Sequence, residues 1–195
     1  MEHDIEKICR ELLDRSRSFC PEPESKVGPG VYALLIDADD LAALDPLTIA
    51  EDGLVYVGMT ADRAGERNHF ALEHSGFSSP RRSLGALLKN KLPLRACRRA
   101  PGLSDSNWKN YRFTGAGENA LTQWMNERLS MNHVPLSGDK DDIEEVETQV
   151  IARLQPPMNL KKWRNPQKKM VEELRKICRD EARGGTMSQT EIIPL

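Results

Sequence analysis

The sequence predicts an α+β fold: a small, mainly antiparallel sheet of three strands flanked by helices, with further helices added at both ends of the chain. Residues 31–37, 54–58 and 110–114 are short runs of the kind that form strands, and the first is rich in Val, Leu, Ile and Tyr. Around them, apolar residues recur at the spacing of amphipathic helices. With 195 residues, of which 38% are hydrophobic, the chain is long enough to bury one core.

The first half of the chain is expected to begin with a helix at residues 3–18. Residues 20–30 are rich in Pro and Gly and should form a connection, and residues 38–52, polar and rich in Asp, should form a loop between the first two strands. A further helix is expected at residues 63–75. The first helix would bury the face made by Ile5, Ile8, Cys9, Leu12 and Leu13.

In the second half, Ser79-Pro80 should open a helix, because Pro is favoured in the first helical turn. Its leucines are expected to face inward and its basic residues outward. A loop at 100–107, a helix at 117–131 and a basic helix at 165–183 follow, and the tail from Gly184, which has no periodicity, is expected to be mobile. The expected inner faces consist of Leu84, Leu87 and Leu88, then Leu121, Trp124, Met125 and Leu129, then Met170, Leu174, Ile177 and Cys178.

One more helix is expected before Pro156-Pro157, and it carries a carboxylate on its apolar face. At about 100° per residue, Glu147 falls inside the apolar stripe, whereas Glu144 and Glu145 point away. A carboxylate on a buried face is costly unless it pairs with a cation or binds a metal. A Glu satisfied by an Arg and a metal ligand are therefore both open interpretations. The stripe consists of Ile143, Val146, Val150, Ile151 and Leu154.

Charge is unevenly distributed along the chain, although the net charge is only −2. Residues 80–115 contain nine Lys and Arg against Asp105 alone, whereas residues 139–147 are strongly acidic. A basic stripe is the expected footprint for a phosphate backbone, and a solvated helix face is the alternative. The candidate nucleic-acid-binding residues are Arg81, Arg82, Lys89, Lys91, Arg95, Arg98 and Arg99.

Several other classes of protein are disfavoured. No run of about 18 apolar residues is present, so no membrane helix is expected. The acidic, amphipathic start at Met1-Glu2-His3-Asp4 is unlike a secretory signal. The sequence contains no indication of an oligomeric state. Four cysteines without metal or redox spacing are interpreted as reduced thiols of a cytoplasmic protein: Cys9, Cys20, Cys97 and Cys178.

Two tripeptides and three single residues form the most informative pattern. Gly30-Val31-Tyr32 and Tyr56-Val57-Gly58 fall on the first two strands, and Glu147 is followed twelve residues later by Asn159, just after Pro-Pro-Met. Together with Arg67, this order resembles the GIY-YIG nuclease superfamily over roughly residues 28–160. The resemblance implies that the tripeptides lie on adjacent strands and that the chain is a metal-dependent endonuclease that hydrolyses phosphodiester bonds of DNA.

The same resemblance implies a role for each matching residue. Glu147 would bind one Mg²⁺ or Mn²⁺ ion in a one-metal mechanism, and Arg67 would contact the phosphate. Tyr56 is preferred as the residue that activates or positions water, with Tyr32 as its partner. Asn159 would order the site through hydrogen bonds.

Two histidines follow Arg67, and His74, on the inner face of the expected helix, is preferred over His69 as an auxiliary residue. Met59 stands where some members of the family have Lys. The interval from Tyr56 to Arg67 is one residue longer than in several relatives, so Arg63, one helical turn earlier, is the alternative to Arg67.

The corresponding domain organisation has a nuclease domain at residues 28–163, with insertions at 38–52 and 76–138. An N-terminal helix and linker occupy residues 1–27, a basic C-terminal helix 164–183 and the tail 184–195.

Each assignment has a structural alternative. The tyrosines would then be core residues, Arg67 the counter-ion of a structural acid, Asn159 a turn residue and His74 a core histidine. For the whole chain, the alternative is a non-cleaving nucleic-acid-binding or protein-interaction module on the same scaffold. The complete set favours the nuclease, because such a module would not need a carboxylate on an apolar face. DNA is the expected partner, RNA remains open, and no membrane is involved.

Overall fold

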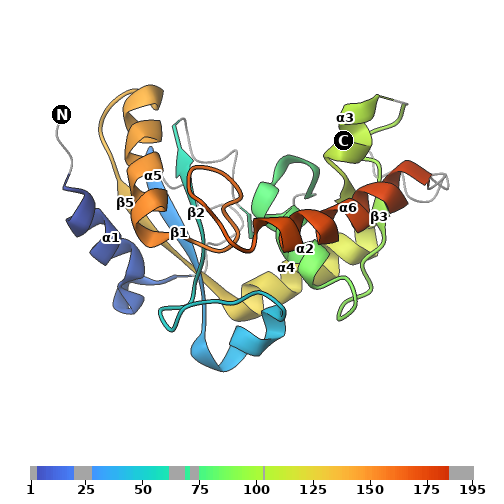
Figure 1. Ribbon diagram of the computed structural model, residues 1–195, viewed down its shortest axis with the longest axis horizontal. Coiled ribbons are helices and arrows are strands. Elements are labelled where there is room, and N and C mark those ends of the chain that lie inside the picture. The colour runs from blue at the N-terminus through green and yellow to red at the C-terminus, as the bar shows by residue number, and fades with distance from the viewer. Residues whose placement is uncertain (1–3, 20–27, 62–68, 71–74, 103, 185–195) are drawn as a thin grey trace.

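The computed structural model describes residues 4–19, 28–61, 69–70, 75–102 and 104–184 (Figure 1). The helix expected at 63–75 and the tail from Gly184 therefore lie largely outside the described residues. Within the described residues, no helix is both long enough and apolar enough to cross a membrane.

A three-stranded antiparallel sheet lies at the centre of the fold, in the order β2-β1-β5 (Figure 1). Strand β1 is Gly30–Ile36, β2 is Leu54–Thr60 and β5 is Leu129–Pro135. Every residue of β1 is buried, because helices cover both faces of the sheet and successive side chains alternate between the two cores. The α+β class and the three-stranded antiparallel sheet are confirmed.

The third strand of this sheet is not the expected segment 110–114. Only Arg112–Phe113 of that segment is a strand, β4, and it pairs with β3, Ala96–Cys97, in a separate two-stranded sheet. Strand β5 was not predicted, since Leu129 continues the apolar spacing of the preceding helix. Asn132 is a polar residue at a buried position of this strand, so the apolar pattern of a strand is interrupted there. It is buried because its amide donates to the carbonyls at the end of the N-terminal helix.

Helices α1, Ile5–Leu13, and α5, Lys140–Leu154, cover one face of the sheet (Figure 1). The N-terminal helix buries the expected face but ends before residue 18, where the short 3-10 helix η1, Arg15–Arg17, follows. Helix α5 starts at a capping box between Asp139 and Asp142 and ends at Gln155, which adopts a left-handed conformation just before the two prolines. The stripe expected on α5 is buried, Glu147 included, apart from Leu154, which is half-buried.

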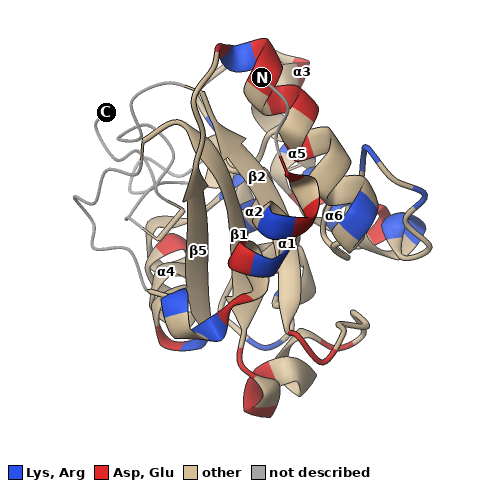
Figure 2. Ribbon diagram, turned by 90° about the vertical axis from the view of Figure 1, so that its left-hand side faces the viewer, with Lys and Arg blue, Asp and Glu red and all other residues tan. Residues whose placement is uncertain are grey.

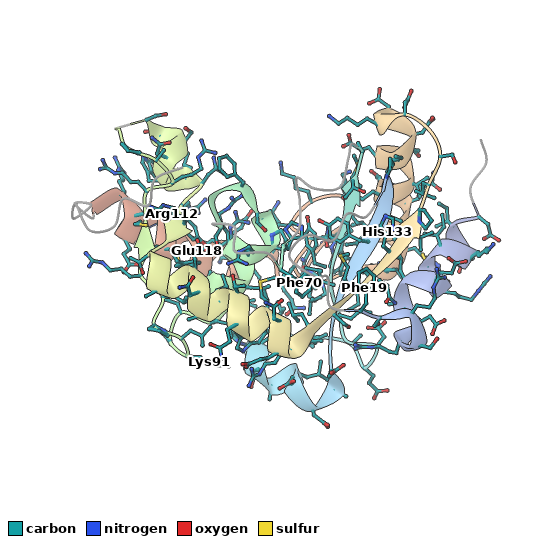
Figure 3. The ribbon with its side chains drawn as sticks, turned by 180° about the vertical axis from the view of Figure 1, so that it is seen from behind. Phe19, Phe70, Lys91, Arg112, Glu118 and His133 are labelled. Carbon is teal, nitrogen blue, oxygen red and sulfur yellow. The ribbon has the colours of Figure 1, made fainter. Side chains whose placement is uncertain are left out.

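Helices α2, Ser79–Leu87, α4, Gly115–Arg128, and α6, Lys168–Gly184, lie on the other side (Figure 1). Shorter helices occur in segments expected to be loops: η2 is Ala38–Leu44 and α3 is Asp105–Lys109. A further short helix, η4, is Ser75–Phe77. Phe70 lies between the sheet and these helices and is 1% exposed (Figure 3). This side holds the larger of the two cores.

Helix α6 faces the core with a different set of side chains from the one expected. Val171, Cys178 and Ala182 are buried, whereas Ile177 is 55% exposed. The prediction that Ile177 faces inward is wrong, because the buried stripe of Val171, Cys178 and Ala182 lies roughly 120° around the helix from it. Met170 and Leu174 pack at the edge of the core.

A buried ion pair between Arg81 and Glu118 joins α2 to α4, where Glu118 points into the interior (Figure 3). Arg81 Nη2 lies 2.8 Å from Glu118 Oε2, and the guanidinium also donates to Thr122 Oγ1 and to the carbonyl of His69. The outward orientation expected for the basic residues of this helix is therefore wrong for Arg81, which is 0% exposed. Its charge is compensated inside the protein.

Replacing Glu118 by Gln should destabilise the fold strongly, because it leaves the charge of Arg81 buried and unpaired. The expected loss in the free energy of unfolding is about 3–5 kcal/mol. Urea denaturation monitored by circular dichroism measures it. Asp105→Asn is the control, since Asp105 pairs with Lys109 on the exposed surface and should unfold like the parent. Equal midpoints for the two variants would contradict a compensating role for Glu118.

Candidate active site

The two tripeptides meet through a steric fit across β1 and β2. Tyr32 pairs with Gly58 in the antiparallel register, and a Cβ atom at Gly58 would lie only 2.3 Å from Tyr32 Oη. The missing side chain of Gly58 therefore makes room for the phenol. At the start of β1, a Cβ atom at Gly30 would lie 2.2 Å from the carbonyl oxygen of Val134. Each glycine allows a close approach that no other residue permits.

Tyr32 is buried behind the site and is held by a chain of hydrogen bonds. It is 3% exposed, and its hydroxyl lies 2.6 Å from His69 Nε2. The other ring nitrogen of His69, Nδ1, lies 2.9 Å from Ser78 Oγ at the start of α2. His69 was not among the preferred site residues, and His74, which was, lies outside the described residues. The burial of His69 depends on contacts distant in sequence, so the spacing alone could not rank the two.

Tyr56 occupies a more open position than Tyr32. It is half-buried and lines a cavity of about 410 Å³. Its ring centroid lies 6.3 Å from that of Tyr32, with the two planes tilted by 42°. The two tyrosines are thus neighbours, and Tyr56 faces the cavity.

Glu147 reaches the same cavity from α5 and is paired with a lysine. It is 9% exposed, and its Oε2 lies 2.5 Å from Lys162 Nζ, which also lies 3.2 Å from Glu144 Oε1. Partial burial by itself lowers the pKa of Lys162, but the hydrogen bonds and charges of the two carboxylates together raise that pKa above its ordinary value. The cation pair weighed for Glu147 is present, with Lys in place of Arg. Glu147 Oε1 makes no hydrogen bond within the described part of the chain.

Asn159 ties the segment after α5 to the edge strand of the sheet. Its side-chain amide donates to the carbonyl of Val57 at 2.8 Å, and its Oδ1 accepts the Val57 amide at 2.9 Å. The backbone of Met158 also donates to the carbonyl of Val55. These bonds satisfy backbone groups on the open edge of β2, which would otherwise be buried without partners. Asn159 thereby keeps the segment that carries Lys162 next to the strand that carries Tyr56, and both residues line the same cavity.

Six cationic side chains surround this cavity, and most come from the C-terminal part of the chain. Arg82 comes from α2, and it is the one member of the predicted basic set that the described lining includes. Helix α6 carries Lys and Arg on its surface, in contrast to the acidic first turns of α5 (Figure 2). The cations are Arg82, Lys161, Lys162, Lys168, Arg175 and Arg179.

The other predicted nucleic-acid-binding residues lie elsewhere. Arg81 is enclosed with Glu118, and Lys89 Nζ lies 2.5 Å from Glu181 Oε2. Lys91 and Arg95 are exposed, and two arginines in the turn around β3, Arg98 and Arg99, are half-buried.

Of the predicted catalytic residues, the structure brings Tyr56, Glu147 and Asn159 together around one cavity and places Tyr32 directly behind Tyr56. Arg67 and its alternative Arg63 lie outside the described residues.

Residues 30–181 match the model of a protein family described as the GIY-YIG catalytic domain. The chain belongs to the GIY-YIG family. Searches of the curated proteins and of the solved structures returned no match. Membership supports a nuclease-type function in general, and the matched residues include β1, β2, α5 and most of α6.

The residues around Glu147 fit a metal ion held by a single carboxylate. Within the described residues, no group of three or more His, Cys, Asp and Glu side chains could hold a metal. Glu147 lines the cavity of about 410 Å³, and its Oε1 makes no hydrogen bond within the described residues. Mg²⁺ favours this kind of site, because it keeps several water ligands and needs only one or two carboxylates.

A methyl group at position 58 should disturb the GIY-YIG motif through Tyr32. Gly58→Ala places a Cβ atom against the phenol, so we expect a loss of about 1–3 kcal/mol in the free energy of unfolding, as for other overpacked sites. Gly28→Ala is the control, because a Cβ atom there meets nothing within 4 Å. Combining Gly58→Ala with Tyr32→Ala should remove most of the added cost. Additive losses in urea denaturation would contradict the steric fit.

Proposed function

We propose that this protein is a metal-dependent endonuclease that hydrolyses phosphodiester bonds of DNA by a one-metal mechanism. The observation that supports this most directly is the meeting of Tyr56, Glu147 and Asn159 at a cation-lined cavity of about 410 Å³ in a GIY-YIG chain. Cations suit the phosphate backbone of a nucleic acid, and the cavity volume falls within the range of about 300–1,000 Å³ typical of ligand sites.

Hydrolysis of a phosphodiester needs an activated water and stabilisation of the charge that develops on the phosphate. Tyr56 is assigned to the water, because its ring lies at the cavity, whereas Tyr32 is 3% exposed and lies behind it. Tyr32 and His69 then act behind Tyr56, fixing its surroundings. Arg67 is assigned to the scissile phosphate, since a guanidinium can donate two parallel hydrogen bonds to it.

Glu147 is the residue assigned to Mg²⁺ or Mn²⁺. When bound there, the ion supplies a Lewis acid for the phosphate oxygens. Lys162 keeps a positive charge next to this carboxylate, and its partly exposed stem allows the ammonium group to turn toward solvent or toward phosphate.

A non-cleaving nucleic-acid-binding module is the second candidate, and the ion pair between Glu147 and Lys162 favours it. A carboxylate that is satisfied by an ammonium group needs no metal. The two functions differ in what removal of the carboxylate does to cleavage and to metal-dependent stability.

Glu147→Gln should abolish cleavage while leaving DNA binding intact. Incubation of plasmid DNA, single-stranded DNA and RNA with Mg²⁺ or Mn²⁺ tests the activity, and thermal melts with and without Mn²⁺ test the ion. The parent should melt at a higher temperature with Mn²⁺, and the variant should not.

Glu144→Gln is the matched control for this variant, since Glu144 also contacts Lys162 but its side chain is 51% exposed. It should cut DNA and respond to Mn²⁺ like the parent. A rise in melting temperature that persists in Glu147→Gln would exclude Glu147 as the ligand. A parent protein that binds DNA but cuts no substrate with either ion supports the non-cleaving module.

Arg67→Lys should lower turnover strongly with near-normal folding, because lysine keeps the charge but loses the fork that a phosphate accepts. Arg63→Lys is the control, and we expect it to cut at close to the parental rate. Single-turnover rates on the preferred substrate measure both. The opposite ranking of the two variants would assign the phosphate contact to Arg63.

A further inference from the structure

The cavity at the candidate active site has two walls of different chemistry. Tyr56, Glu147 and Asn159 form the wall on the side of β2 and α5. The opposite wall consists of the first turn of α2 and one face of α6, where the pocket-lining residues recur at helical spacing. From α6 they are Lys168, Glu172, Arg175 and Arg179.

The charge on this second wall is not balanced by carboxylates. Glu172 lies 3.9 Å from Lys168, and Glu147 is engaged by Lys162. Within the part of the chain that the structure describes, Arg82, Arg175 and Arg179 take part in no ion pair. Arginines packed together without an acid are repulsive unless an anion joins them.

Arg82 shows this repulsion most clearly. It is 8% exposed, and its Nε atom is buried without a hydrogen-bond partner, although Nη1 donates to the carbonyls of Ser75 and Gly76. Burial, and then the neighbouring charge of Arg175, lower the pKa of Arg82 to about 10.

Arg175 spans the gap between α6 and α2. Its Nη1 lies 3.5 Å from the hydroxyl oxygens of Ser79 and Ser83, which are long contacts that leave most of the guanidinium free to accept another partner. Ser79 belongs to the first turn of α2, where the helix dipole also favours an anion. Arg82, Arg175 and Arg179 therefore line the same cavity from two helices.

We propose that Arg82, Arg175 and Arg179 form a second phosphate subsite, which binds a backbone phosphate of the nucleic-acid strand next to the phosphate that is cleaved. The inference rests on the proposed function and adds to it a means of positioning the strand. Because this wall faces the one that carries Tyr56 and Glu147, a phosphate held here fixes how the strand enters the active site.

The test compares two double variants of α6 that remove the same charge. Arg175→Gln with Arg179→Gln empties the subsite. Lys169→Gln with Lys176→Gln removes two cations that pair with Glu173 and Asp180 on the outer surface of the same helix. Thermal melts establish that each variant is folded, and Arg179→Gln alone serves if the first double variant is not, since no hydrogen bond of Arg179 is present among the described residues.

Binding of a fluorescent 15-nucleotide DNA is measured by anisotropy in EDTA between about 50 and 200 mM salt, the range where counterion release is visible. We expect the arginine variant to bind more weakly and to lose about one unit of slope in the plot of log affinity against log salt, as for one phosphate contact. The lysine variant should keep the parental slope. Equal slopes for the two double variants overturn the proposal.

Two further experiments distinguish a phosphate of the strand from free phosphate, and failure of the subsite from failure of the proposed nuclease function. In a set of oligonucleotides, a neutral methylphosphonate replaces one phosphate at a time along the strand. For the parent, KM should rise when the replacement lies at one position beside the cleaved bond. For the arginine variant, KM should not rise at that position. If inorganic phosphate raises the melting temperature of the parent but not of the arginine variant, while DNA slopes are equal, the subsite takes free phosphate and the strand assignment is wrong. Absence of cleavage in the parent refutes the nuclease, whereas the binding slopes still decide the subsite.

Discussion

The buried ion pair between Arg81 and Glu118 is the interaction on which the arrangement behind the candidate active site depends. The two oxygens of Glu118 also accept hydrogen bonds from Ser75 and from the backbone of Phe113. One carboxylate thus joins α2, α4, η4 and β4. Arg81 in turn donates to the carbonyl of His69, whose ring is bonded to Tyr32. Helix α2 is therefore connected to Tyr32 through His69.

A second constraint acts at the open edge of the sheet. Strand β2 is the outer strand next to the cavity, and an open edge leaves backbone groups without partners. Asn159 occupies this edge with both ends of its amide, and the loop behind it is closed by Trp163 and Asn165, which donate to carbonyls of residues 156–159. The Glu-to-Asn interval of the motif has a physical meaning here. It lets one segment finish α5 with Glu147 at the cavity and then bond to the strand that carries Tyr56.

The parts of the fold that the sequence predicted are those that a local pattern specifies. Strands β1 and β2 follow from short runs of strand-forming residues and the stripe of α5 from a period of 3.6 residues, and Glu147 was found because it interrupts that stripe. Other features depend on distant partners. Asn132 on β5 is satisfied by carbonyls at the end of α1, Arg81 by Glu118, and Glu147 by Lys162. Nothing near these residues in sequence shows which polar group is paired inside, so β5, the burial of Arg81 and the identity of the cation were missed.

The distribution of charge follows the same logic. The segment 80–115 is strongly basic by sequence, yet many of its charges contact Glu118, Glu181, Asp105 or backbone carbonyls, and Arg82 is its member at the cavity. The other cations of the described lining belong to residues 161–179, which include most of the helix predicted to be basic. Lys169 and Lys176 pair with acids on the outer surface of the helix, whereas Lys168, Arg175 and Arg179 line the cavity. A local charge count cannot separate these two groups, because the helical period places one on the surface and the other on the site. The fold therefore concentrates a positive potential at one wall of the cavity in a chain whose net charge is −2.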